Sequence, residues 1–257
     1  MSKFGPQLQF WRKARRLSQL QLAVEADVSS RHISFLETGR AAPSRPMVQH
    51  LSDILDVPHA RRNDLFDAAG FSPQHSRSAL TDEHMQMVSS AMSQMLERHA
   101  PFPAIVIDAN WVLVQLNKPA QKLFGAIGLG CGANMLDFVA TSGAAAQVIE
   151  NWPEVGHHFL QRLTGESRAA GGLRALDKAI TSLRNDPAIA NYDPPSPLPP
   201  LISINYSVGG LKLPMISAIA QFGGAEDLTV TDLKIELMFP ATKEAQTWLE
   251  ENFGSDP

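Results

Sequence analysis

With 257 residues, of which 44% are apolar and 19% charged, the chain is long enough for two domains and too apolar for a disordered or collagen-like protein. Its single cysteine, Cys131, excludes an intrachain disulfide framework. No apolar run approaches the roughly 18–20 residues of a membrane span, and no secretory signal is visible. We therefore expect a cytoplasmic protein with no membrane partner. Residues 1–48 carry eight basic and three acidic side chains, whereas residues 77–257 carry twelve basic and nineteen acidic ones, so the N-terminal part alone is expected to meet a polyanion.

Residues 6–70 show only helical periodicity with short breaks, which predicts an all-α region of five helices. Ser18 and Gln21 form the sequence pattern of a capping box, so a helix begins there. Gly39 supplies the left-handed position that ends the next helix. We expect the five helices to run through Leu8–Arg15, from Ser18, from Ser29 to Thr38, from Ser44 to Leu55, and from about Pro58 to Ala69.

The second and third of these helices are joined by a tight turn at Asp27-Val28, which is the arrangement of a helix-turn-helix. The residues that carry a family resemblance are Ser18–Ala23, Ala26, Val28-Ser29, Ile33-Ser34, Glu37, Gly39-Arg40 and Pro43-Ser44. Together they resemble the lambda-repressor-like (XRE) domain. Asp27 stands where that family usually has glycine, and Asp tolerates the backbone conformation. The resemblance implies a DNA-binding domain, which we place at residues 1–72.

The outward positions of the third helix share one face, the face that would enter the major groove of a double-stranded DNA operator. Arg31 is suited to a guanine edge and Phe35 to a thymine methyl group. Ser29 caps a helix whether or not it also binds DNA, and Phe35 can instead be half-buried or an interface anchor. Gln19 and Ser29 at helix starts, and Arg40 just after the third helix, are placed to contact phosphate oxygens of the DNA backbone. The predicted DNA-binding residues are Gln19, Ser29, Ser30, Arg31, Ser34, Phe35 and Arg40.

Residues 73–100 are predicted to form a polar linker followed by a connecting helix over Leu80–His99. Its apolar residues are spaced alternately three and four apart, which is the pattern of an a/d seam. That seam would pair with the same helix of a second subunit or pack on a neighbouring sheet, and the spacing favours neither. The seam consists of Met85, Val88, Met92, Met95 and His99.

Residues 101–257 predict an α+β domain with an antiparallel sheet of about five strands. The first two strands form a hairpin with its turn at Ala109-Asn110. Pro214 marks an edge or a bulge in its strand, and the prolines within Pro194–Pro200 form a stiff extended connection. Strands are expected over 104–108, 111–117, 201–208, 211–222 and 233–239, with helices over 118–125 and 243–252 and a mainly helical segment over 126–190.

The order of strand, turn, strand, Asn117, short helix and glycine resembles the opening of a PAS domain. In combination with the N-terminal domain, a set of motifs resembles the MmyB-like transcription regulators over nearly the full chain. These motifs are Pro103–Asp108, Trp111, Asn117, Leu123-Phe124-Gly125, Asn151-Trp152 and Val155. The resemblance implies a PAS-like ligand-binding domain, with a fatty acid as the class of ligand. The proline-rich stretch at 194–200 departs from the family's pattern.

A ligand pocket in this domain would draw on large apolar side chains, although any core needs the same residues. A carboxylate head would require a cation at the rim, for which Arg162, His158 and Arg168 are candidates. The predicted ligand-binding residues are Phe124, Met135, Phe138, Phe159, Arg162, Leu163, Met215, Ile219 and Met238.

We therefore expect a one-component transcription regulator that is not an enzyme, since no catalytic or metal-binding constellation is visible. No cofactor is expected apart from a fatty acid held as a ligand. A homodimer is expected because one such domain offers few base contacts, whereas paired domains span two half-sites. The alternatives are a DNA-binding scaffold whose PAS-like domain serves only dimerisation or recruitment, and an enzyme tethered to DNA.

Overall fold

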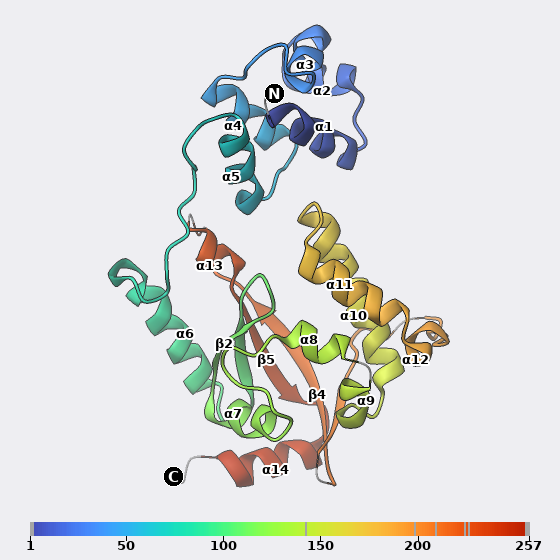
Figure 1. The fold of residues 1–257 in the computed structure, drawn as a ribbon. Coiled ribbons are helices and arrows are strands. Elements are labelled where there is room, and N and C mark those ends of the chain that lie inside the picture. The colour runs from blue at the N-terminus through green and yellow to red at the C-terminus, as the bar shows by residue number, and fades with distance from the viewer. Residues whose placement is uncertain are drawn as a thin grey trace. The chain divides into compact units, whose positions relative to one another are not determined.

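The computed structural model describes residues 3–141, 143–197, 199–208, 210–223, 225 and 227–254. It divides into two compact units, one holding mainly the chain up to Arg77 and the other mainly the chain from Ser78 onward. Each unit has its own hydrophobic core. Figure 1 shows a first unit made only of helices and a second unit in which helices surround a sheet.

The first unit contains the five helices that the sequence predicts. Three of them begin at a serine whose hydroxyl accepts a hydrogen bond from the backbone N–H three residues later, which is the usual N-cap geometry. Ser18 and Gln21 complete a capping box. The helices are α1 (Phe4–Ala14), α2 (Gln19–Glu25), α3 (Ser30–Glu37), α4 (Arg45–Ile54) and α5 (His59–Ala68).

The turn between α2 and α3 sets the angle of the helix-turn-helix. Asp27 has a φ of 50°, a left-handed conformation that glycine adopts most easily and that a short polar side chain tolerates. Leu22 and Ala23 of α2 pack with Ile33 and Leu36 of α3, and all four are buried. The expected helix-turn-helix is therefore present, with Asp27 in place of glycine.

Helix α1 crosses the C-terminal end of α3 at very short range. A Cβ atom on Gly5 would lie 2.3 Å from the carbonyl oxygen of Glu37, so only glycine fits there. A buried ion pair lies at the same crossing: Arg12 Nε is 2.6 Å from Glu37 Oε1, and Arg12 Nη2 donates to Oε2 at 2.9 Å. Gln19 Nε2 also donates to Oε2, at 2.7 Å. One carboxylate thus joins α1, α2 and α3.

As the sequence predicts, the second unit is an α+β structure around a five-stranded antiparallel sheet. The strand order in the structure is β2-β1-β5-β4-β3. The strands are β1 (Ala104–Ile107), β2 (Leu113–Leu116), β3 (Ile204–Val208), β4 (Leu211–Ala220) and β5 (Lys234–Pro240). The helices are η1 (Glu83–Met85), α6 (Gln86–Arg98), α7 (Lys118–Gly125), α8 (Met135–Ala140), α9 (Ala144–Val148), α10 (Trp152–Ala169), α11 (Arg174–Arg184), α12 (Pro187–Ala190), α13 (Leu228–Asp232) and α14 (Lys243–Phe253).

Successive residues of the sheet enter two different cores, one on each face. Ile105 and Ile107 belong to the larger core, with side chains from α7 to α12 and α14. Ala104 and Val106 belong to the smaller core, where they meet α6. Figure 1 shows α6 on one side of the sheet and α10 and α11 on the other.

The apolar seam of the connecting helix packs on this sheet. Met92 and Leu96 are buried against strands β1 and β5, with Val88 and Met95 beside them. Within the single chain, the seam therefore contacts the sheet. The helix starts later than expected, because the Asp82 carboxylate accepts a hydrogen bond from the Ala79 N–H and holds a turn.

The first hairpin turns over a longer stretch than the sequence predicts. Trp111 has a φ of 62° and lies in the turn rather than in a strand, and β2 begins only at Leu113. The Asp108 carboxylate accepts hydrogen bonds from the N–H groups of Asn110 and Val112, both at 2.9 Å, and so stabilises this wide turn. The Trp111 side chain is buried in the larger core. Helix α13 was not expected from the sequence.

Pro214 lies where β4 has a single partner strand. Strand β3 pairs with β4 from Leu211 to Met215, and β5 pairs with it from Met215 to Ala220. The missing N–H of Pro214 therefore falls in a half of the strand that is flanked on one side, which agrees with the predicted edge position. Within the described ranges, no helix combines the length and apolar character needed to cross a membrane.

Candidate functional site

The outward flank of α3 presents two guanidinium groups around one aromatic ring. The Arg31 guanidinium carbon lies 5.1 Å from the centre of the Phe35 ring, and that of Arg40 lies 5.8 Å from it. Arg31, Arg40 and Ser30 are exposed, while Phe35 and Ser34 are half-buried. This flank is thus a positively charged surface with a half-buried aromatic ring at its centre.

Two of the predicted DNA-binding residues already hold structural hydrogen bonds. Ser29 Oγ accepts from the His32 N–H at 3.1 Å and caps α3, but the exposed hydroxyl can still donate its proton. Gln19 Nε2 donates to Glu37 at 2.7 Å and leaves one N–H and its oxygen at the N-terminal end of α2. Both residues therefore lie at helix starts, with their side chains held in place.

Glu37 stays ionised although it is buried. Burial disfavours the charged carboxylate, but the hydrogen bonds from Arg12 and Gln19 and the charge of Arg12 outweigh burial, and the pKa of Glu37 lies below its ordinary value. The same pair raises the pKa of Arg12, chiefly through the hydrogen bond to Glu37. The Glu37 carboxylate therefore carries a fixed negative charge, and its hydrogen bond to Gln19 orients the Gln19 side-chain amide.

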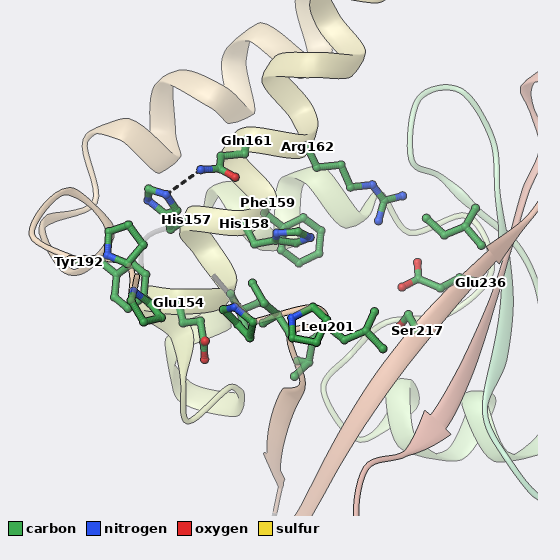
Figure 2. Close-up of a pocket in the computed structure, with 18 residues that line it drawn as sticks. Glu154, His157, His158, Phe159, Gln161, Arg162, Tyr192, Leu201, Ser217 and Glu236 are labelled. Carbon is green, nitrogen blue, oxygen red and sulfur yellow. Dashed lines mark hydrogen bonds between the residues drawn. The ribbon is translucent and has the colours of Figure 1, made fainter. Parts of the chain in front are cut away.

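The second unit contains a cavity of about 330 Å³ between α10, the proline-rich segment and the sheet (Figure 2). Its apolar walls come from one turn of α10, from β3 and β4, and from prolines at both ends of the proline-rich segment. The apolar lining residues are Val155, Phe159, Pro194, Pro195, Pro199, Pro200, Leu201, Ile202, Ile204 and Ile219.

Polar side chains lie at both ends of the cavity. Figure 2 shows His157 and Tyr192 at one end, and Arg162 and Glu236 at the other. Gln161 Nε2 donates to His157 Nε2 at 2.9 Å. The polar lining residues are Glu154, His157, His158, Gln161, Arg162, Tyr192, Ser217 and Glu236. The cavity is therefore amphipathic, with an apolar middle.

A charged cluster adjoins the Arg162 end. Arg162 Nε donates to Glu166 Oε1 at 3.1 Å, and Lys234 Nζ is 2.7 Å from Glu166 Oε2. The Arg162 guanidinium carbon lies 4.5 Å from the centre of the Trp111 ring, whose Nε1 donates to Glu166 at 3.2 Å. Burial opposes ionisation of Glu166, but the hydrogen bond and charge of Lys234, followed by Arg162, outweigh it and lower the pKa of Glu166.

The predicted ligand-binding residues lie in three places. Phe159, Arg162 and Ile219 line the 330 Å³ cavity. Phe124, Met215 and Met238 line a second, apolar cavity of about 30 Å³ together with Tyr206. The remaining three, which line neither of these two cavities, belong to the larger core: Met135 and Leu163 are buried in it and Phe138 packs against it.

Sequence reasoning missed Glu236 and the role of the proline-rich segment as a wall. Glu236 follows Ile235 and precedes Leu237, which face the smaller core, so strand alternation turns Glu236 toward the larger one. The sequence signal that could have identified Glu236 is a single charged residue at an inward-facing position of an otherwise apolar strand. In the described part of the chain, no three His, Cys, Asp or Glu side chains converge as a metal site, and Cys131 is exposed.

Comparisons with known proteins match both parts of the chain. Residues 88–251 match the model of the MmyB-like transcription regulator ligand binding domain, and residues 3–65 match a helix-turn-helix domain model. The Bacillus subtilis (strain 168) protein named uncharacterized HTH-type transcriptional regulator RghRB is 35% identical over 115 residues, which are 43% of this chain and 79% of that protein. An RNA-binding light-oxygen-voltage receptor of known structure is 14% identical with a TM-score of 0.27; the match covers 98% of this chain and 62% of the receptor.

Proposed function

Since the chain belongs to the MmyB-like transcription regulators and carries a helix-turn-helix domain, we propose that it is a one-component regulator acting in the cytoplasm. Its first unit binds a double-stranded DNA operator. Its second unit binds a small amphipathic molecule, with fatty acids as the first class to test, and the bound ligand changes the affinity for the operator.

The exposed flank of α3 supports the DNA-binding part of this proposal more than any other single feature. A major groove admits one α-helix, and Arg31 beside Phe35 offers both a guanidinium fork for guanine and an apolar surface for a thymine methyl group. Ser30 and Ser34 lie on the same flank. Gln19, Ser29 and Arg40, at the helix ends, are placed to contact phosphate oxygens and to fix the position of α3 on the duplex.

We propose a homodimer as the DNA-binding form. One helix-turn-helix presents a single short reading helix and hence few base contacts, whereas two can occupy half-sites about one helical turn of DNA apart. The seam of α6 is covered by its own sheet, so the dimer contact is sought elsewhere on the chain.

The cavity supports a sensing role for the second unit. Its volume of about 330 Å³ falls within the range of roughly 300–1,000 Å³ that small-molecule sites occupy. Phe159 and Ile219 offer an apolar wall for an alkyl chain, and Arg162 lies at one end for its head group. This feature favours a sensor over the scaffold alternative, in which the unit serves only dimerisation or recruitment.

Ligand binding can change operator affinity only if the ligand binds one arrangement of the dimer better than another. We place this coupling at the connecting helix α6, which follows the first unit in the chain and packs on the same sheet that forms a wall of the cavity. Movement of the sheet would thereby be transmitted to the two DNA-binding units.

The test combines three measurements on the full chain. Mass spectrometry after denaturing extraction identifies a copurified ligand, thermal shift reports binding of added fatty acids, and operator binding is titrated with and without the ligand. We expect a bound or stabilising lipid and a change in operator affinity. Absence of bound lipid together with absence of any thermal shift would contradict the proposed ligand class. Absence of specific DNA binding by the full chain would contradict the proposed role as a regulator.

A further inference from the structure

Charged side chains of opposite sign alternate along the boundary between α10 and β5. Lys234 is paired with Glu166, and Glu166 is paired in turn with Arg162, one helical turn earlier on α10. The next charge in this series is Glu236, two residues after Lys234 and on the same face of β5. The series is therefore Lys234, Glu166, Arg162 and Glu236.

The last step of this series is not closed. Glu236 is only 6% exposed, yet in the described residues no hydrogen bond or ion pair reaches its carboxylate. Its strand partners Ile105 and Ile219 provide no polar group from their side chains. Glu236 also lines the cavity, so its carboxylate is available to a donor on a bound molecule.

Arg162 faces the same gap with donors to spare. Its Nε is bound to Glu166, whereas its buried Nη2 has no hydrogen-bond partner in the part of the chain that the structure describes. Figure 2 shows Arg162 and Glu236 on opposite sides of the same end of the cavity, with Ser217 beside Glu236. Both side chains line this end of the cavity.

We propose that this end of the cavity selects a neutral head group that accepts a hydrogen bond from Arg162 and donates one to Glu236. This proposal rests on the proposed ligand-binding function. A long-chain primary amide has this pattern, with a carbonyl oxygen for Arg162 and an N–H for Glu236. An undissociated carboxylic acid has the same pattern.

A carboxylate head fits less well. It accepts from Arg162, but it brings a second negative charge next to Glu236 and offers no donor. The four charges of the series already balance, with Lys234 and Arg162 against Glu166 and Glu236. A carboxylate therefore gains no net attraction from the end of the cavity, whereas the amide satisfies both unpaired groups.

The experiment compares octanamide with octanoate, two probes with the same alkyl chain, by calorimetric titration of the full chain at neutral pH. We expect the wild-type protein to bind octanamide about tenfold more tightly than octanoate, or better, because a hydrogen bond to a charged group is at stake. In Glu236→Gln the preference should shift toward octanoate by a similar factor, since the new side-chain amide can donate to a carboxylate.

Glu244→Gln is the matched control, because Glu244 is exposed on α14 and is not among the residues that line the cavity. This variant should keep the wild-type ratio of the two affinities. Tighter binding of octanoate by the wild type, or an unchanged ratio in a folded Glu236→Gln, would overturn the inference and leave the proposed sensing function standing. Failure of both probes to bind the wild type would contradict the sensing function itself. The wild-type comparison decides the matter even where Glu236→Gln does not fold.

Discussion

Arg31 and Phe35 lie one turn apart on α3, with the guanidinium carbon of Arg31 5.1 Å from the centre of the Phe35 ring. Arg40 approaches the same ring at 5.8 Å. Stacking of a planar guanidinium on an aromatic ring restricts its rotamers in advance. Both cations are thus held on the exposed flank before DNA arrives, which lowers the entropy that they lose on binding.

The first prediction concerns base readout by Arg31. Arg31→Ala should weaken binding to the operator by about 1–3 kcal/mol and relax the preference at one base pair, because a guanidinium contact to a base edge is removed. Fluorescence anisotropy with the operator and its single-base variants measures both effects. Arg31→Lys retains the charge without the planar fork and serves as the control. Unchanged affinity and unchanged preference would remove Arg31 from the readout.

The second prediction concerns phosphate contact by Gln19. Gln19→Ala should weaken binding to operator and unrelated DNA by the same factor, because a phosphate contact carries no base information. The same titrations with both duplexes supply the ratio of the two affinities. A loss confined to the operator would instead make Gln19 a base reader.

The third prediction concerns the buried ion pair. Because the pKa of Glu37 is lowered in the folded state, the ionised carboxylate contributes stability above the ordinary pKa of 4.5, and this contribution is lost as the pH falls through the lowered value. Glu37→Gln should therefore destabilise the first unit at neutral pH by about 3–5 kcal/mol, the usual cost of removing one partner of a buried pair, and should flatten its acid sensitivity.

Amide hydrogen exchange of α1, α2 and α3 in the full chain measures this effect, with the sheet of the second unit as an internal reference. Glu25→Gln, at an exposed position of α2, is the control and should change stability by less than about 0.5 kcal/mol. Equal acid sensitivity of wild type and Glu37→Gln would contradict the assignment of the lowered pKa to this pair.

The fourth prediction concerns the volume of the cavity. Ile219→Trp should fill part of the space against Phe159 and abolish the thermal shift produced by the ligand, at small cost to the fold because Ile219 is 47% exposed. Met87→Trp makes the same kind of change on α6, where Met87 is 80% exposed, and should leave the thermal shift intact. An undiminished shift in Ile219→Trp would place the ligand elsewhere.

Local signals in the sequence were sufficient for the helical unit. The serine caps at Ser18, Ser29 and Ser44 involve residues three positions apart, so the pattern contains the interaction that forms. The five strands were also predictable, because branched and apolar runs mark them. The wide turn around Trp111 was not, since it depends on the Asp108 side chain and on burial of the indole in a core made by distant segments.

The candidate sites differ in the same way. The flank of α3 follows from helical periodicity, so its residues could be named from the sequence alone. The cavity brings together α10, the proline-rich segment and β5, which lie far apart in the chain. Sequence reasoning therefore named Phe159 and Ile219 but could not separate them from core residues such as Leu163. It missed Glu236, because only the three-dimensional structure shows that this carboxylate has no hydrogen-bond partner among the described residues.

Met215 is the one described position at which β4 pairs with strands on both sides. The part of β4 from Leu211 to Pro214 pairs with β3 alone, whereas the part from Met215 to Ala220 attaches the β3–β4 hairpin to β5. Ile204 of the cavity wall lies on β3 of this hairpin, whereas Glu236 lies on β5. Ile204 pairs with Met215 itself, so this wall of the cavity has a fixed position relative to Glu236, and the width between them limits which molecules can enter.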